Sequence, residues 1–300
     1  MKISKMISLF SATVIMTAAM AVPVSAERDP FTNEYFRVEQ KEKSGFSLSG
    51  DILTKTDENG TYGFTGKVKI NGSSKFYDNG VQWTGWRKVK GKWYYFDPDN
   101  NGIMAEGKVK TALGYYYFDK NGAWNGKLSK SAKCPEDLEF MMSESCGMSD
   151  IEGYTIDTAS DLLKVPGVYS DDDTRSVKLS KRDMQIFYDV IMSCKLTESK
   201  SDLTGYGIIK TMPPEGEYYM SDDTPVYSAS FTVSGKSFEI KGDYDMFQFC
   251  GKNEDVRNFA YFRAFADRYI QALPEYSELM AIHEAAIAEY NARYSDNENY

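Results

Sequence analysis

Residues Gly85 to Gly126 read GWRKVKGKWYYFDPDNNGIMAEGKVKTALGYYYFDKNGAWNG, and this stretch decides the fold of the first half of the chain. It contains an internal repeat, since the run WYYFD that begins at Trp93 returns as YYYFD at Tyr115. A less regular copy, GKVKINGSSKFYDNG, occupies residues 66–80. Self-similarity at a fixed period is typical of proteins that stack one small structural unit several times. The sequence therefore predicts roughly three stacked units.

Each predicted unit has the pattern of a β-hairpin. A short aromatic run is followed by Asp and then by Asn-Gly, a pair that supplies the positive φ angles of a tight hairpin turn. A single hairpin buries too little surface to be stable, so the units must stack and use their rings as the packing between neighbours. Most of the rings are therefore expected to form a solenoid core.

The pattern Gly-Trp, then Gly-x-Trp-Tyr-Tyr-Phe-Asp, then Asn-Gly and Met resembles the choline-binding repeats of Gram-positive surface proteins and phage lysins, also called cell-wall-binding repeats. The resemblance covers Gly66 to Gly126 and implies a hairpin solenoid that holds choline between neighbouring hairpins. A quaternary ammonium has no proton to donate, so ring faces hold it. Carried over by position, the resemblance implies that the choline-binding residues include Trp86, Tyr94 and Tyr116.

Two further residues belong to this predicted site. Trp93 is a fourth candidate ring, although the sequence leaves open which face of its strand points inward, and Met104 is expected to line the pocket. Lys67 and Lys108 stand where the other repeats would need the Trp of a Gly-Trp pair, so only one complete cage can be assembled. The segment is then either a weak choline site or a spacer, and the resemblance also admits a glucan ligand.

The N-terminus and the charge suggest an exported protein. Residues 1–26 have lysines, an apolar run and a final Val-Ser-Ala, which is the order of a signal peptide. The full chain carries a net charge of −9, whereas residues 66–126 hold ten Lys or Arg against five Asp or Glu. The acidic total argues against nucleic acid as a partner, and the basic segment fits an anionic wall polymer. No other segment is apolar enough to span a membrane.

The other segments divide into a leader and a second domain. Residues 27–65 are predicted to form a leader with a short hairpin, residues 66–127 the repeats, and residues 135–300 an α+β domain with an antiparallel sheet and C-terminal helices. Ser180 and Asp183 favour a helix start, and strands are expected at 227–233, 238–240 and 244–249. A helix is predicted from Val256 to Leu273, and Pro274 separates it from a last helix.

Four cysteines follow the repeats, namely Cys134, Cys146, Cys194 and Cys250. In an exported chain they are disulfide candidates, with a local Cys134–Cys146 pair predicted and free thiols as the alternative. Their spacing carries no metal signature. The stretch Asp97–Gly102 copies the first half of a calcium loop, but Lys108 stands where the last ligand would be, so a plain hairpin turn and no metal are predicted.

Catalytic groups are hard to find in the second domain. His283 is the only histidine and lies on a predicted helix, where a solvated or packed role is favoured over catalysis. Glu144, Asp150 and Glu152 could supply the carboxylate pair of a glycosidase, but nothing in their context singles them out. We predict no catalytic residue and no cofactor.

The predicted function is that of a secreted, wall-associated surface protein. Its repeats would bind cell-wall polymers, through teichoic acid choline or glucan, and its second domain would be presented to an extracellular partner. The alternative is a cell-wall hydrolase, a carboxylate glycosidase or an amidase, with the repeats as its targeting module, because the resembling repeats commonly accompany lytic domains.

Overall fold

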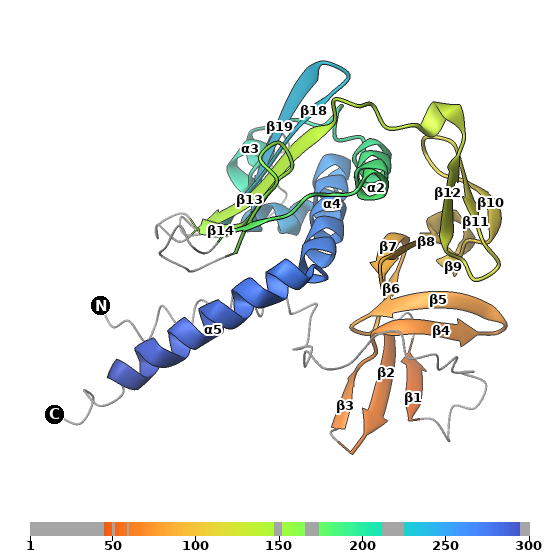
Figure 1. Ribbon diagram of the computed structural model, residues 1–300, viewed down its shortest axis with the longest axis horizontal. Helices are drawn as coiled ribbons and strands as arrows, with labels where there is room; N and C mark the ends of the chain where they lie inside the picture. The colour runs from red at the N-terminus through yellow and green to blue at the C-terminus, as the bar shows by residue number, and fades with distance from the viewer. Residues whose placement is uncertain are drawn as a thin grey trace. The chain divides into compact units, whose positions relative to one another are not determined.

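The computed structural model describes residues 45–49, 52–58, 60–146, 152–165, 174–211 and 225–294 (Figure 1). The predicted signal peptide and just over half of the predicted leader lie outside these residues. The chain divides into two compact units, of which the first runs to Val109 and includes Tyr116–Lys127, and the second holds Lys110–Tyr115 and the chain from Leu128 onward. Within the described residues, no helix has the length and apolar character that a membrane crossing needs.

The first unit begins with a six-stranded antiparallel sheet. Its strands run in the order β1-β2-β6-β5-β4, with β3 paired to β2. Their bounds are β1 Phe46–Ser49, β2 Ile52–Asp57, β3 Gly60–Gly63, β4 Gly66–Ile70, β5 Ser73–Asp78 and β6 Val81–Trp83. The buried residues Phe46, Leu53, Val68 and Tyr77 form a small core for this sheet.

Two three-stranded sheets follow along the chain, drawn from light orange to yellow in Figure 1. The first contains β7 (Gly85–Val89), β8 (Lys92–Asp97) and β9 (Ile103–Met104), and the second contains β10 (Gly107–Lys110), β11 (Tyr115–Phe118) and β12 (Trp124–Leu128). The prediction of successive β-hairpin units is confirmed by this arrangement.

The hairpin turns have the backbone angles that the sequence demands. Asn79 and Gly80, which link β5 to β6, have φ angles of 50° and 84°, as a type I′ turn requires. The calcium-like stretch connects β8 to β9 through a short 3₁₀ helix, η2 (Pro98–Asn100), rather than a plain hairpin turn. The Asp97 carboxylate accepts a hydrogen bond from the Asp99 backbone N–H at 3.0 Å, and the Gly102 N–H donates to the Asp97 carbonyl at 2.8 Å.

The second unit is an α+β structure, as predicted. A seven-stranded sheet runs in the order β16-β15-β14-β13-β18-β19-β17, antiparallel except between β17 and β19. The strands are β13 Glu139–Cys146, β14 Glu152–Asp157, β15 Leu162–Lys164, β16 Thr174–Ser176, β17 Asp202–Leu203, β18 Pro225–Val233 and β19 Lys236–Asp243. The helices are η3 Lys130–Ala132, α2 Lys181–Ser193, α3 Gly205–Thr211, η4 Tyr244–Phe249, α4 Glu254–Gln271 and α5 Pro274–Tyr294.

One face of this sheet packs against α2 and α4. Phe187 of α2 stacks on Phe140 of β13, with ring centroids 4.5 Å apart, and contacts Phe265 of α4 at 5.0 Å. Side chains on β18 alternate between buried and half-buried, which is the pattern of a strand with one face against a core. The Ser180 and Asp183 capping box starts α2 where the sequence predicted it.

The segment 244–249 is a 3₁₀ helix, and the predicted strand there is wrong. The Asp243 carboxylate accepts a hydrogen bond from the Met246 N–H at 3.0 Å and caps the first turn. The same carboxylate also accepts from the Gly205 N–H, at the start of α3. Strand β19 therefore ends at Asp243, because the carboxylate of this residue satisfies backbone N–H groups at the starts of two helices.

Candidate functional site

The predicted site residues lie in a group of packed rings within the first unit, which we call the Trp86 cluster. Trp86 on β7 is at its centre, and the ring centroids of Tyr116 and Tyr95 lie 5.0 Å and 5.1 Å from it. The other members are Trp93, Phe118 and Trp124, at 6.5 Å, 5.7 Å and 6.1 Å. Three sequence-predicted rings, Trp86, Trp93 and Tyr116, are therefore brought together.

The fourth predicted ring, Tyr94, is on the opposite face of β8. It belongs to a second group, the Phe76 cluster, whose buried members are Phe76, Val89, Tyr94, Phe96, Met104 and Ala123, with the half-buried Trp83 packed against them. Strand β7 pairs with β8 so that Trp86 lies across from Tyr95 and Arg87 across from Tyr94. Because successive side chains on a strand alternate in direction, Tyr94 and Met104 do not join Trp86.

Tyr95 is the ring that sequence reasoning missed. It occupies the place beside Trp86 that the repeat alignment assigned to Tyr94. The signal that could have found it is the two-residue period of the strand, which puts Trp93 and Tyr95 on one face. The repeat alignment shows which residues are equivalent in successive repeats. It does not show which neighbouring hairpin each face of a strand contacts.

Trp83 and Trp124 share a separate structural role. Each stands two residues before a glycine, Gly85 or Gly126, and each donates its indole N–H to the backbone carbonyl three residues ahead. The acceptors are the carbonyls of Trp86, at 3.1 Å, and Lys127, at 2.9 Å. These bonds fix the ring at the corner between consecutive hairpins.

The Trp86 cluster is closed in this structure. Trp86 is 1% exposed, Tyr116 is fully buried, and Tyr95 is the most exposed member at 9%. A cation that is held by ring faces needs to approach within about 6 Å of a ring centroid. An external ammonium group can therefore reach these rings only if a ring at the edge, of which Tyr95 is the most exposed, turns aside.

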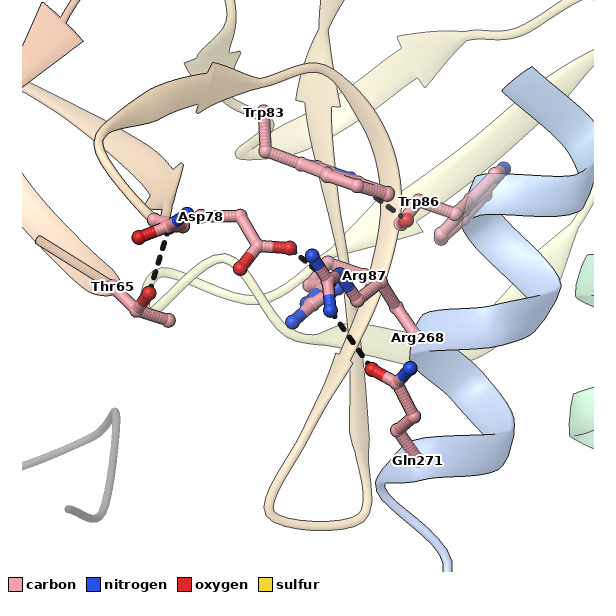
Figure 2. A network of polar contacts seen from close by, with 8 residues as sticks. Thr65, Asp78, Trp83, Trp86, Arg87, Arg268 and Gln271 are labelled. Atoms are coloured by element: carbon pink, nitrogen blue, oxygen red, sulfur yellow. Dashed lines mark hydrogen bonds and ion pairs between the residues drawn. The ribbon is translucent and has the colours of Figure 1, made fainter. Parts of the chain in front are cut away.

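Several ring faces in the first unit already carry a cation of the chain. Lys88 Nζ lies 5.8 Å from the Trp93 ring centroid, and Lys67 Nζ lies 5.7 Å from that of Tyr94. Arg87 lies against two rings and forms an ion pair with Asp78, which Figure 2 shows together with Trp83 and Trp86. Cation binding by aromatic faces is thus a property of this unit's own packing.

The cysteines that the structure describes are not activated nucleophiles. Burial raises the pKa of the Cys134 thiol to about 11 and that of Cys194 to about 12. A reactive cysteine needs a lowered pKa, so these thiols are neutral at physiological pH. Cys134, Cys194 and Cys250 form no disulfide with one another, and the side chain of Cys146 is outside the described residues. The predicted Cys134–Cys146 bond stays a prediction.

Of the three glycosidase candidates, only Glu144 has a side chain that the structure describes. Glu144 on β13 forms an ion pair with Arg263 of α4, at 3.2 Å, and burial raises its pKa. The Arg263 guanidinium also stacks on Tyr227, whose pKa burial raises in turn. Asp150 and the side chain of Glu152 lie outside the described residues. Glu144 thus has a structural partner.

The remaining chemical candidates give no site. The buried Nδ1 atom of His283 on α5 has no hydrogen-bond partner among the described residues, whereas a catalytic histidine of the triad type needs an orienting group there. Within the same residues, no three His, Cys, Asp or Glu side chains are grouped closely enough to hold a metal ion.

Comparison with known proteins identifies the repeat segment. The family model of the choline-binding repeat matches residues 64–101 and 83–124. No curated protein matches the sequence.

Solved structures of choline-binding proteins are similar to part of the chain. Choline binding protein F from Streptococcus pneumoniae is 31% identical over 27% of this chain, which spans 28% of that protein, with a TM-score of 0.21. The choline binding domain of Spr1274 from S. pneumoniae is 32% identical over 21% of this chain and 96% of that domain, with a TM-score of 0.19. A pneumococcal cell wall endolysin from phage Cp-1, complexed with choline, is 25% identical over 31% of this chain and 33% of its own, with a TM-score of 0.18.

Proposed function

Residues 64–124 belong to the choline-binding repeat family, and from this premise we propose that the first unit attaches the chain to choline-bearing polymers of a cell wall. In this proposal the protein is exported with the help of residues 1–26, stays outside the cell at the wall, and presents the region 135–300 to an extracellular partner. The polymer is a choline-substituted teichoic acid, with glucan as the other candidate.

The observation that carries the proposal is the Trp86 cluster. It gathers the Trp of the sequence's one Gly-Trp pair with aromatic side chains from β8 and β11, which belong to consecutive hairpin units. A quaternary ammonium has no N–H to donate, so its charge is stabilised by several ring faces at once. Rings from two consecutive hairpins around one centre provide such faces. The ten Lys and Arg of residues 66–126 supply the positive field that draws an anionic wall polymer toward these rings.

Affinity at this site is expected to be low. Each ring contact contributes about 0.5–2 kcal/mol, and turning a packed ring aside costs part of that gain. A total near 4 kcal/mol corresponds to a dissociation constant on the order of 1 mM. Lys67 and Lys108 replace the Trp of the other repeats, so the chain has one such site and gains little from multivalency.

Titration of the full chain with choline, followed by tryptophan fluorescence, tests the proposal. All four tryptophans lie between Trp83 and Trp124, so the signal reports on the first unit alone. We expect a saturable change with choline and a weaker one with its uncharged isostere 3,3-dimethylbutan-1-ol. Tyr116→Leu should weaken binding several-fold, whereas Tyr206→Leu, an exposed tyrosine on α3, serves as a matched control.

Two outcomes would contradict the proposal. One is the absence of any saturable change up to the solubility limit of choline, and the other is an equal response to choline and to its neutral isostere. Retention on immobilised dextran but not on immobilised choline would instead assign the first unit to glucan.

A further inference from the structure

A second cation-binding arrangement lies in the first unit, apart from the Trp86 cluster, and its cation belongs to the chain. Arg87 Cζ is 5.2 Å from the centroid of the Phe76 ring and 5.0 Å from that of the Trp83 ring. Its Nη1 atom lies 3.5 Å from Oδ2 of Asp78. Two ring faces and one carboxylate therefore contact the Arg87 guanidinium, and Figure 2 shows Asp78, Trp83 and Arg87 close together.

The walls of this arrangement are held by bonds other than those to Arg87. The indole N–H of Trp83 donates to the Trp86 carbonyl at 3.1 Å, which orients the ring. Phe76 is fully buried and packs against Phe96 with ring centroids 5.6 Å apart. Asp78 ends β5, and the N–H of the next residue, Asn79, donates to Thr65 at 2.7 Å. The two rings and the backbone that carries Asp78 are thus held by contacts other than those to the arginine.

Arg87 departs from the other repeats at its position. The residue two after the glycine that opens each unit is Val68, Val109 or Leu128 in the other copies, and Val68 is fully buried. Arginine stands at this position only in the copy that begins at Gly85. A charged side chain at an otherwise apolar position is costly unless it finds partners, and here it finds two rings and a carboxylate.

We propose that Phe76, Trp83 and Asp78 form a cation site that the chain fills with its own Arg87, and that removing the guanidinium opens this site to a small quaternary ammonium ion. The site is within reach of solvent, because the Arg87 side chain is 14% exposed and Trp83 is half-buried. Truncation to alanine deletes the guanidinium and most of its stem, so a volume bounded by ring faces is vacated next to an anionic carboxylate. Arg87 thereby sets how many external cations the first unit holds.

This inference rests on the proposed function only for the class of ligand, a quaternary ammonium ion. The geometry around Arg87 does not depend on the proposed function. The probe is tetramethylammonium chloride, compared with sodium chloride at equal ionic strength and with uncharged 3,3-dimethylbutan-1-ol. Thermal unfolding of the full chain, followed by tryptophan fluorescence, reads out binding because a ligand of the folded state raises the unfolding midpoint by mass action.

Arg87→Ala is the main variant, and Lys92→Ala is its matched control. The control removes the same charge from an exposed residue of β8 in the same hairpin. At about ten times its dissociation constant, tetramethylammonium should raise the midpoint of Arg87→Ala by about 5 °C more than that of the wild type or of Lys92→Ala. The double variant Trp83→Leu/Arg87→Ala should lose this extra rise, since one wall of the site is gone.

Loss of the ion pair could prevent Arg87→Ala from folding, because Asp78 would keep a buried charge. Asp78→Asn/Arg87→Ala removes both charges and keeps both rings, so it should fold and still respond to tetramethylammonium, more weakly than the single variant. The inference is wrong if every folded arginine variant responds no more than the wild type. A response of Arg87→Ala with none in the wild type would sustain this inference and refute the proposed choline site, so the two failures are distinguishable.

Discussion

Tyr94 and Tyr95 offer a matched test of which ring face binds choline. They are neighbours on β8, of the same residue type and similarly buried, at 8% and 9% exposure. Replacement of either by leucine removes a packed ring and should lower the free energy of unfolding by about 1–3 kcal/mol. Only Tyr95 lies against Trp86, at a centroid distance of 5.1 Å. We therefore expect Tyr95→Leu, and not Tyr94→Leu, to weaken choline binding.

The expected size follows from the loss of one ring face. A cation–π contact is worth about 0.5–2 kcal/mol, so the dissociation constant should rise about 2- to 30-fold in Tyr95→Leu. Tyr94→Leu should change it less than about 2-fold, because that ring packs in the Phe76 cluster. Choline titrations of both variants, together with their thermal midpoints, give affinity and stability separately.

The reasoning is refuted if Tyr94→Leu loses affinity and Tyr95→Leu keeps it. That result would mean that the position carried over from the repeat pattern is right, and that choline enters on the face of β8 occupied by the Phe76 cluster. If both variants lose the same choline affinity and have the same thermal midpoint, binding depends on the stability of the hairpin stack and not on one face of β8.

Two further predictions concern the second unit. Thr111 Oγ1 donates a hydrogen bond to the buried carboxylate of Asp189 at 2.8 Å. In urea unfolding, Thr111→Val should therefore lower the free energy of unfolding by about 1–3 kcal/mol, whereas Thr111→Ser should be close to wild type. Similar free energies of unfolding for the two variants would refute a role for the hydroxyl. Arg263→Met removes the guanidinium that pairs with Glu144, a carboxyl group whose pKa burial already raises. In the folded variant Glu144 should therefore hold a proton that it releases in the unfolded state. Its destabilisation, about 3–5 kcal/mol at neutral pH by circular dichroism melts, should shrink as pH falls toward the ordinary pKa of glutamate, and a loss independent of pH would contradict this.

The sequence predicted the elements whose signals are local. Asn-Gly turns, the WYYFD runs and the alternation on β18 each lie within a few residues, and each element is present. The strand predicted at 244–249 failed because its pattern did not include the Asp243 cap, which also bonds the Gly205 N–H across 38 residues of sequence. A side chain that serves two helix starts cannot be recognised from one segment.

In the candidate site, too, the features with a local sequence signal were predicted and those that depend on distant contacts were not. The repeat alignment found Trp86 and Tyr116, because equivalent positions in a stack play equivalent parts. It could not choose between Tyr94 and Tyr95, because each strand of a stacked hairpin has one face toward the unit before and another toward the unit after. The contact between Thr111 and Asp189, separated by 78 residues, had no signal in any short pattern.

The basic residues of the repeats act in two ways, by contact with aromatic rings of the chain itself and, under the proposed function, by long-range attraction of an anionic wall polymer. Lys67, Lys88 and Arg87 each lie over at least one ring face, so three of the ten cations in residues 66–126 occupy faces that an external ammonium would otherwise contact. These internal contacts stabilise a stack too small to rely on apolar burial alone, at the cost of ligand sites. Attraction of an anionic polymer, by contrast, draws on charge at long range and is screened by salt, whereas a desolvated ring contact is not. Under the proposed function, the basic residues of the repeats still attract an anionic wall polymer at long range, while Arg87 keeps choline from the rings of Phe76 and Trp83.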